Sequence, residues 1–380
     1  MSSRPFDASI AAGSVSRRVP FVNFPAQWAE ERETLRPILE RVFEAGTFVG
    51  GEEVERFEAE AAAFLGVGSV VALNSGTDAL ILALLALGVG PGDEVITPSN
   101  SFVASTAAIV RVGATPVFAD VTADQTIDPA AVEAALTSRT KAIMPVHLAG
   151  RVAAMGALSA LASRHGIAIV EDAAQAFGSK DGEKYAGTFG VGAFSAHPLK
   201  NLNAAGDAGF IATDDAALAE RVARLRNHGL LDRDTALEFG TVSRMDGLQA
   251  AILRYRLTRT FDVIARRSAN ARHYDALPAR VPVVVPPVRP GSTHTYHLYV
   301  IQAPRRDDLR VWLAERGIET KIHYPTPIHL QPAARKLGYR RGSLPETERQ
   351  AARILSIPIN QSLRRDEIDY VAEAIEAFYR

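Results

Sequence analysis

The sequence predicts an α/β protein in which a large lobe with a mostly parallel central sheet precedes a smaller C-terminal α/β lobe. Between Asp93 and Thr213, short β-rich runs alternate with Ala/Leu-rich helical stretches, a spacing typical of βαβ units. The runs AIVED (168–172) and FVAST (102–106) are largely apolar, as strands buried on both faces of a parallel sheet should be. A Pro/Val-rich segment, 281–291, separates this region from a second α/β pattern.

Each expected element follows from a local pattern. Strands of the central sheet are expected over Glu94–Thr97, Thr115–Val121, Ala142–His147, Ile167–Asp172, Ala193–His197 and Gly209–Thr213, with helices over Ala130–Leu136 and Ala154–Arg164. The segment Asp78–Leu87 is apolar nearly all round, which predicts a deeply buried helix. The C-terminal part should hold one long helix over 245–278, an alternating strand over 294–302, a strand over 318–323, and helices near 306–316, 346–354 and 365–379.

These patterns divide the chain into three parts. Residues 1–18 are expected to form a flexible tail, 19–245 a large domain, and 246–380 a linking helix with a small C-terminal domain. The longest apolar run, 79–89, is far shorter than the roughly 18 residues of a membrane span. The N-terminus lacks the apolar core of a signal peptide, so no membrane partner is expected.

Composition excludes several classes of function. The 380 residues include 42 lysines and arginines against 43 aspartates and glutamates, whereas nucleic-acid-binding proteins usually carry a basic excess. With no cysteine in the chain, disulfides, thiolate-ligated metals and thiol nucleophiles are ruled out. A cytoplasmic location is expected, because a chain without disulfides fits a reducing compartment.

The first candidate for chemistry is Lys200, which follows a predicted strand in a run of small residues and turn formers. Lysine amines form Schiff bases with carbonyl compounds when they are desolvated or close to other charges. A plain surface lysine is the alternative. Upstream, Glu171 and Asp172 end an apolar strand and Gln175 follows, at the position where open α/β sheets bind ligands. A carboxylate there can hold a protonated ring nitrogen, bind a metal, or cap a helix.

An anion site is expected at Ser75, Gly76 and Thr77, between a strand and the buried helix. Free backbone N–H groups and the helix dipole favour phosphate there, and a simple Ser/Thr N-cap is the alternative. Phe102 lies in SNSFVAST and suits either ring stacking or core packing. A phosphate site, a strand-end aspartate and a later lysine in one α/β lobe together match the layout for pyridoxal phosphate.

These motifs also carry a family resemblance. The sequence resembles sugar aminotransferases of the DegT/DnrJ/StrS type, within the three-layer fold type I of pyridoxal-phosphate enzymes. The resemblance rests on VPFVNF, GTFVGGEEVERFE, NSGTDAL, GPGDEVITPSNSFVAS, GATPVFADV, TKAIMPVHLAG, VEDAAQAFGS, FSAHPLKNLNAAGDAG, LRNHG and RMDGLQAAIL, in this order from about Val19 onward. It implies that residues 19–245 form the cofactor-binding domain.

The resemblance assigns a role to each matching residue. Lys200 would form the Schiff base and move the proton, while Asp172 would keep the pyridine nitrogen protonated. Gln175 would bond the phenolic oxygen of the cofactor and Phe102 would stack on its ring. The phosphate ligands would be Gly76, Thr77 and Ser195, joined by Asn227 from the neighbouring subunit of a homodimer. Lysine at position 200 favours amino transfer, because related dehydratases carry histidine there.

Two departures from the family pattern concern the pocket. Val242 stands where an asparagine is common, and Ala149 replaces a tyrosine beside His147.

In the C-terminal part, a loop fixed by prolines gathers His323, Tyr324, His329 and Gln331. Packing is the alternative role for this loop. Metal binding is not expected, because the two histidines have no evident third ligand.

The loop resembles that of family members that aminate C-3 of a nucleotide-linked keto-sugar. It implies that His323, Tyr324 and His329 contact the hexose, with His197 beside them. The expected function is transfer of an amino group from L-glutamate to a nucleotide-diphosphate keto-sugar, with C-3 as the expected position. Amination at C-4 and a non-catalytic regulatory member of the same fold are the alternatives.

Overall fold

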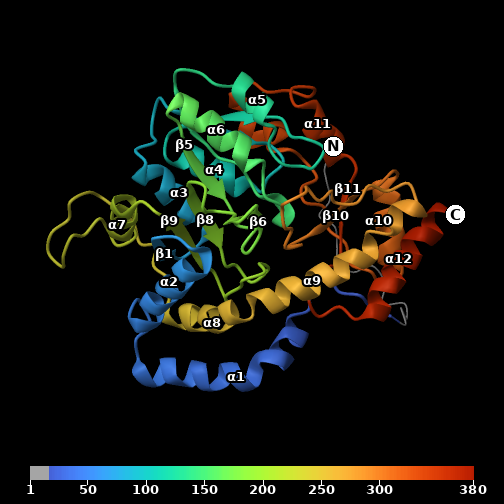
Figure 1. Cartoon of the computed structure of the whole chain (residues 1–380), viewed down its shortest axis with the longest axis horizontal. Coiled ribbons are helices and arrows are strands. Elements are labelled where there is room, and N and C mark those ends of the chain that lie inside the picture. Colours follow the sequence, from blue (N-terminus) through green and yellow to red (C-terminus); the bar gives the residue numbers. More distant parts are fainter. Residues whose placement is uncertain (1–16) are drawn as a thin grey trace.

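The computed structural model describes residues 17–380 as an elongated molecule with a large lobe and a small lobe (Figure 1). The large lobe contains a seven-stranded sheet. In spatial order, its strands are β1 (Ser69–Leu73), β9 (Gly209–Thr213), β8 (Val191–Ser195), β5 (Ala168–Asp172), β4 (Thr140–Ile143), β2 (Glu94–Pro98) and β3 (Thr115–Ala119). Only β9 is antiparallel to its neighbours, so the predicted mostly parallel sheet is confirmed.

Helices cover both faces of this sheet, because alternate residues of each strand point to opposite sides. Val71 and Leu73 of β1 pack with α3 (Gly76–Ala86), α4 (Val103–Arg111) and α7 (Ala216–Leu225). The opposite face packs against α2 (Glu52–Leu65), α5 (Pro129–Ala134), α6 (Met155–His165) and α8 (Gly247–Thr258). The expected burial of α3 is confirmed, since its side chains from Ala79 to Leu84 are largely inaccessible to solvent.

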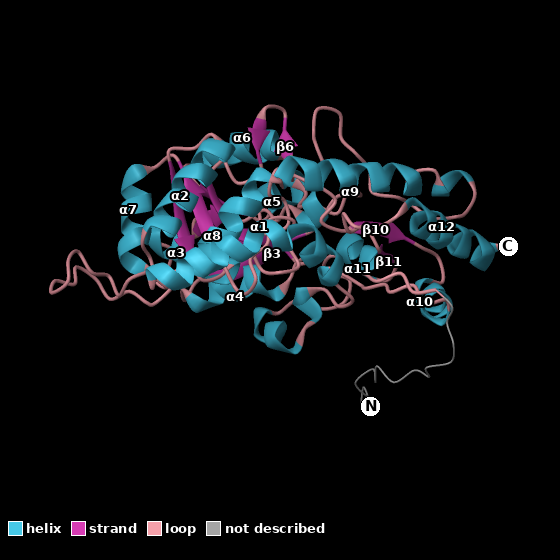
Figure 2. Ribbon diagram, turned by 90° about the horizontal axis from the view of Figure 1, so that it is seen from below, coloured by secondary structure: helices cyan, strands magenta, loops and turns pink. Residues whose placement is uncertain are grey.

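The small lobe has its own apolar core. Its elements are α9 (Thr260–Tyr274), a 3₁₀ turn at Leu277–Ala279, β10 (Tyr299–Gln302), α10 (Arg306–Glu315), β11 (Ile354–Ile357) and α12 (Arg365–Tyr379). The 3₁₀ turns at Ile328–Leu330 and Pro332–Leu337 and helix α11 (Pro345–Ala351) lie instead against the large lobe, beside Phe118 and Asp120. Strands β10 and β11 are antiparallel. Helix α9 runs from the large lobe to α12 in both views (Figures 1 and 2), so it connects the two cores.

Several expected elements differ in the structure. The run FVAST is not a strand, because β2 ends at Pro98 and Phe102 leads directly into α4. The expected single helix over 245–278 divides at Arg259 into α8 and α9. Residues 318–323 form only isolated bridges. The last part of the expected helix 346–354 lies outside α11, and residue 354 begins β11.

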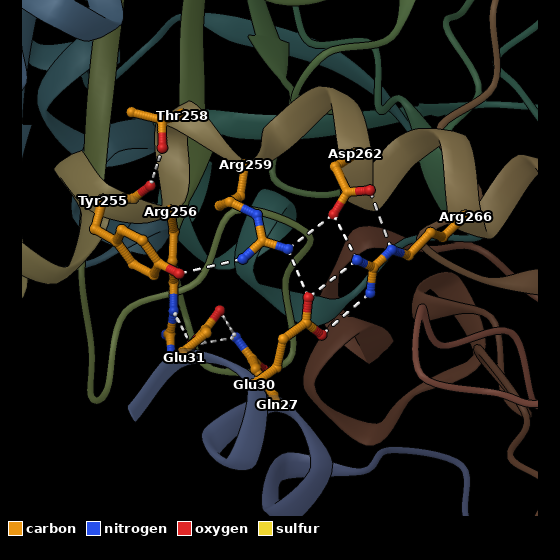
Figure 3. A network of polar contacts seen from close by, with 9 residues as sticks. All are labelled: Gln27, Glu30, Glu31, Tyr255, Arg256, Thr258, Arg259, Asp262 and Arg266. Atoms are coloured by element: carbon orange, nitrogen blue, oxygen red, sulfur yellow. Dashed lines mark hydrogen bonds and ion pairs between the residues drawn. The ribbon is translucent and has the colours of Figure 1, made fainter. Parts of the chain in front are cut away.

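Other segments were not expected from the sequence. These are α1 (Phe24–Ala45), α2, and a small hairpin of β6 (Lys180–Asp181) and β7 (Lys184–Tyr185), whereas β1 is the strand expected before Ser75. The structure adds a network of ion pairs that holds α1 against α8 and α9 (Figure 3). Within it, Arg256 bonds Glu31 at 2.7 Å, and Arg259 and Arg266 share Glu30.

The predicted tail falls mostly outside the described residues, since residues 1–16 are not described. Its last two residues are anchored rather than free: Arg17 pairs with Asp366, and Arg18 with Glu319 at 2.6 Å. Val19 then packs fully buried in the small-lobe core. No helix within 17–380 combines the length and apolar character needed to cross a membrane.

Candidate active site

Lys200 lies in the turn after β8, where its backbone N–H donates to the carbonyl of His197 at 2.8 Å. Its side chain is half-buried and lines a cavity, so the surface-lysine alternative is wrong. Burial lowers the pKa of the amine to about 8, while nearby Asp172 opposes that shift. A lower pKa increases the fraction of free amine, which is the form that attacks a carbonyl.

Asp172 ends β5 with only 6% of its surface exposed. Its carboxylate accepts a hydrogen bond from the Ser105 hydroxyl of α4 at 2.6 Å and from the Ala174 N–H at 3.2 Å. No helix begins after β5, because a series of turns follows. The helix-cap alternative is therefore wrong, and Ser105 fixes the carboxylate near Lys200.

The neighbouring Glu171 is fully buried and serves a different purpose. It accepts backbone hydrogen bonds from Gly187, Phe189 and Gly190 at 2.7–3.0 Å, and it contacts His147 Nε2 at 2.9 Å. Because successive strand residues point to opposite faces, Glu171 braces the loop before β8 while Asp172 is left for the site.

The N-terminus of α3 forms a narrow cradle with β8 and β9. The Ser75 hydroxyl accepts from the Asp78 N–H at 3.1 Å, so Ser75 is indeed an N-cap. A Cβ on Gly76 would lie 2.6 Å from Ser195 Cβ, and one on Gly209 would lie 2.5 Å from the Gly76 nitrogen. Glycine at these positions lets the start of α3 approach β8 and β9 closely, and the free N–H groups of a helix N-terminus suit a phosphate.

An aromatic and an amide group complete the rim of this site. The Phe102 ring is 53% exposed and its centroid lies 5.7 Å from that of Tyr324. The Gln175 amide donates to the Tyr324 hydroxyl at 3.3 Å and accepts from the Ala149 N–H at 2.7 Å. Phe102 is thus a free ring face at the site rather than a core residue.

The C-terminal loop is divided by the structure. His323 contacts the Ser356 hydroxyl at 2.8 Å and stacks on Phe21, while burial lowers its pKa to about 4. Tyr324 reaches Gln175, and burial raises its pKa above the usual value. Both residues therefore lie beside the cofactor residues.

The prediction that His329 contacts the hexose is wrong. Its side chain is buried, its Nδ1 lies 2.8 Å from the Ser99 hydroxyl, and its Nε2 lies 3.1 Å from Glu348. With both ring nitrogens engaged, His329 joins the large lobe to the C-terminal loop. Gln331 also turns back locally, donating to the Thr326 carbonyl at 3.2 Å.

The structure gives the positions of His197 and Asn227 but does not test their predicted roles. His197 is exposed, and its Nδ1 accepts from the Leu199 N–H at 3.2 Å. Asn227 forms a bridge with Val242 and accepts from Arg244 at 3.3 Å. Their contacts with the sugar and with the phosphate of a neighbouring subunit remain predictions.

Sequence reasoning missed a cavity of about 70 Å³ that Lys200 shares with Arg267 of α9. Arg267 falls on the buried face of α9 with Ala271 and Tyr274. This i, i+4, i+7 spacing normally carries apolar residues. An arginine within such a stripe was the signal available in the sequence.

The comparisons with known proteins agree with this geometry. The sequence profile of the DegT/DnrJ/EryC1/StrS aminotransferase family matches residues 29–376. The chain is 44% identical over 362 residues to the erythromycin biosynthesis sensory transduction protein EryC1 of Saccharopolyspora erythraea, covering 94% of this chain and 99% of that one. It is 44% identical over 361 residues to the dTDP-3-amino-3,4,6-trideoxy-alpha-D-glucose transaminase of Streptomyces venezuelae, covering 94% and 95%.

Solved structures extend the agreement to the fold. DesV of S. venezuelae, crystallised in complex with a ketimine intermediate, matches with a TM-score of 0.93 and 43% identity, over 96% of this chain and 99% of that chain. NtdA of Bacillus subtilis with bound cofactor PMP matches with a TM-score of 0.88 and 33% identity, over 94% and 84%. The predicted fold class, aminotransferase activity and pyridoxal-phosphate cofactor are thereby confirmed.

Proposed function

We propose the reaction from a premise that these matches establish: the chain belongs to the DegT/DnrJ/EryC1/StrS aminotransferase family. Its reaction is the transfer of an amino group from L-glutamate to a nucleotide-diphosphate-linked keto-sugar, at C-3 of the hexose. The observation that carries this proposal is the position of the His323–Tyr324 segment, which contacts Gln175 and lines the cavity of Lys200. The S. venezuelae relative, which is named as the transaminase of a 3-amino sugar, supports the C-3 position.

The residues present fit the cofactor. The cradle formed by Gly76, Thr77 and Ser195 would hold its phosphate, and Phe102 would pack against its ring. When bound, pyridoxal phosphate supplies an electron sink for the reacting carbon. That sink requires a protonated ring nitrogen, and the buried Asp172 carboxylate would stabilise the protonated form of that nitrogen.

Lys200 and its neighbours then handle the remaining protons. With its pKa lowered to about 8, the Lys200 amine accepts and returns a proton near neutral pH, as a general base should. The hydrogen bond from Ser105 keeps Asp172 oriented. The His323 imidazole is neutral at pH 7, because burial lowers its pKa to about 4. A neutral ring both donates and accepts hydrogen bonds, which suits sugar hydroxyls.

The two half-reactions test this proposal separately. Purified holoenzyme should be yellow and lose its colour on addition of L-glutamate. The colour should then return when a nucleotide-linked 3-keto-sugar is added. Return of the colour with a 4-keto-sugar alone would replace the C-3 assignment by the C-4 alternative. A holoenzyme inert to glutamate and to every keto-sugar would favour a regulatory role.

The homodimer and the cytoplasmic location belong to the same proposal. If Asn227 binds the phosphate in the neighbouring site, Lys200→Ala and Asn227→Ala chains mixed together should form some dimers with one intact site. Mixed preparations should then recover activity that neither variant has alone. Failure to recover activity, with dimers present, would contradict the shared site.

A further inference from the structure

We propose that Arg267 binds a carboxylate group of the amino donor in the cavity that it shares with Lys200. The inference rests on the proposed function, because it assumes a dicarboxylic amino donor. It adds a recognition residue for that donor on α9, in a cavity that His323 of the loop assigned to the sugar also lines.

The cavity lies where the two lobes meet. Its walls come from the start of α1, the Lys200 turn, α9 and the segment after β11. Among the lining residues are Phe21, Asn203, Arg267, His297, His323 and Gln361. Gln27 of α1 donates to Asn203 at 3.1 Å, so the ion-pair network of Figure 3 also fixes one wall of the cavity.

The charge in this cavity is entirely positive. Lys200 and Arg267 line the cavity, and no aspartate or glutamate is among the described residues that line it. Its other polar side chains are mainly amides and imidazoles. Burial, together with the charges of Lys200 and Arg267, lowers the pKa of His297 well below the usual value. The histidines are therefore neutral near pH 7, and the lysine and arginine provide the attraction for an anion.

Arg267 has no acidic partner within residues 17–380. Only 7% of its surface is exposed. Its guanidinium donates to the carbonyls of Tyr296 and His297 at 3.0 and 3.3 Å and to the Gln361 side chain at 3.0 Å, while its Nε has no hydrogen-bond partner. Burial lowers its pKa only to about 10, so the group stays charged at neutral pH.

Two other arginines with little exposed surface pair with acids, whereas the buried Arg151 donates to the backbone carbonyl of Asp124. Arg256 bonds Glu31 at 2.7 Å and Arg306 bonds Asp307 at 2.6 Å. A buried charge without a partner is costly. Arg267 is such an unpaired charge, and it lies beside the reactive lysine. An anionic ligand that pairs with Arg267 during the reaction would explain its presence there.

A carboxylate is the anion that fits this position. The cofactor phosphate already has the cradle at α3, so the anion in this cavity is a different one. The amino donor must bring its α-amino group to Lys200's side of the site, and its carboxylates are small, planar anions. Guanidinium groups pair with carboxylates through two parallel hydrogen bonds.

The decisive variant is Gln361→Glu, which places a carboxylate beside Arg267 without removing the arginine. The new acid should pair with the guanidinium and compete with the donor. We expect the KM for L-glutamate in the first half-reaction to rise roughly 10- to 100-fold, the usual effect of losing a charged hydrogen bond. The sugar half-reaction should change less than about 2-fold. Gln361→Met is the matched control, since it removes the hydrogen bond without adding charge, and its effect on KM should be much smaller.

A binding measurement supplements the kinetics. Glutarate is a dicarboxylate without an amino group, and calorimetry should show that it binds the wild-type holoenzyme. It should bind the Gln361→Glu and Arg267→Gln holoenzymes more weakly. Unchanged glutarate affinity and unchanged KM in a folded Gln361→Glu enzyme would overturn the proposal and leave Arg267 a scaffold residue. Equal damage to both half-reactions would also overturn it.

The two proposals fail in different ways. If no keto-sugar accepts the amine but glutarate binding still depends on Gln361→Glu, the sugar assignment fails and the carboxylate site stands. If the enzyme transaminates nucleotide sugars with glutamate and Gln361→Glu changes neither KM nor glutarate affinity, the carboxylate site fails and the reaction stands.

Discussion

Asp172 should raise the pKa of the Lys200 amine, so its replacement by asparagine should make the lysine more reactive. In the wild-type protein, burial lowers the pKa of Lys200 from 10.5 to about 8 and the Asp172 charge works against that shift. A difference of about 2.5 pH units corresponds to about 300-fold more free amine well below both values. In cofactor-free Asp172→Asn, burial remains and the opposing charge is gone, so the pKa should fall below about 8.

The assay is reductive methylation of the cofactor-free protein across a range of pH, with peptide mass spectrometry to follow Lys200. The exposed Lys336 in the same digest is the reference for reagent reactivity. The free-amine form dominates above the pKa, so labelling of Lys200 should rise with pH to a midpoint near 8 and the variant's midpoint should be lower. A wild-type midpoint near 10.5, or an upward shift in Asp172→Asn, would refute the reasoning from burial.

Three further outcomes are expected. Asp172→Asn holoenzyme should keep its cofactor but lose at least about 100-fold in turnover, the usual scale for losing an electrostatic partner; near-normal turnover would show that another group protonates the ring. Gly76→Ala should weaken cofactor binding at least about tenfold, because its Cβ would lie 2.6 Å from Ser195 Cβ. The control Gly156→Ala in α6 should leave the affinity unchanged, because its Cβ would have nothing within 4 Å. Equal affinities of the two variants in a fluorescence titration would show that the phosphate does not bind at Gly76. His329→Ala should lower the free energy of unfolding by about 1–3 kcal/mol and spare the half-reactions of the folded enzyme, as urea titrations and single-turnover kinetics can check; a selective loss of the sugar half-reaction would restore the original prediction.

The large lobe was predictable because its patterns are local. Apolar runs, their spacing and the position of polar residues at strand ends place Asp172, Gln175 and Lys200 at one edge of a parallel sheet. The start of the buried helix α3 was predictable for the same reason, since an N-cap serine and a glycine precede an apolar run. Each of these inferences needs only residues within a few positions of one another.

The C-terminal loop was harder to interpret, because its role depends on partners far away in the sequence. His323 and His329 each lie two residues from a proline and differ little in local pattern. Only the fold shows that His329 meets Ser99 on the large lobe, whereas His323 faces Phe21 and the Lys200 cavity. Polar residues in an irregular loop have no periodicity that would indicate which of them is buried.

A residue's direction, rather than its chemical type, decides its function at the end of β5. Glu171 and Asp172 are adjacent acids of similar chemistry, and period-two alternation sends them to opposite faces of the sheet. The face with α4 offers Asp172 one hydroxyl and one backbone N–H, leaving part of its capacity for a ligand. The other face offers Glu171 three backbone N–H groups and the His147 ring, which nearly exhausts its acceptors. A carboxylate whose acceptors are already used stabilises the loop that carries the strand toward Lys200, and one with acceptors to spare is available to the cofactor. Exchanging the two residues would preserve composition and charge, yet it would leave the cofactor nitrogen facing a longer side chain and the loop before β8 short of its acceptor.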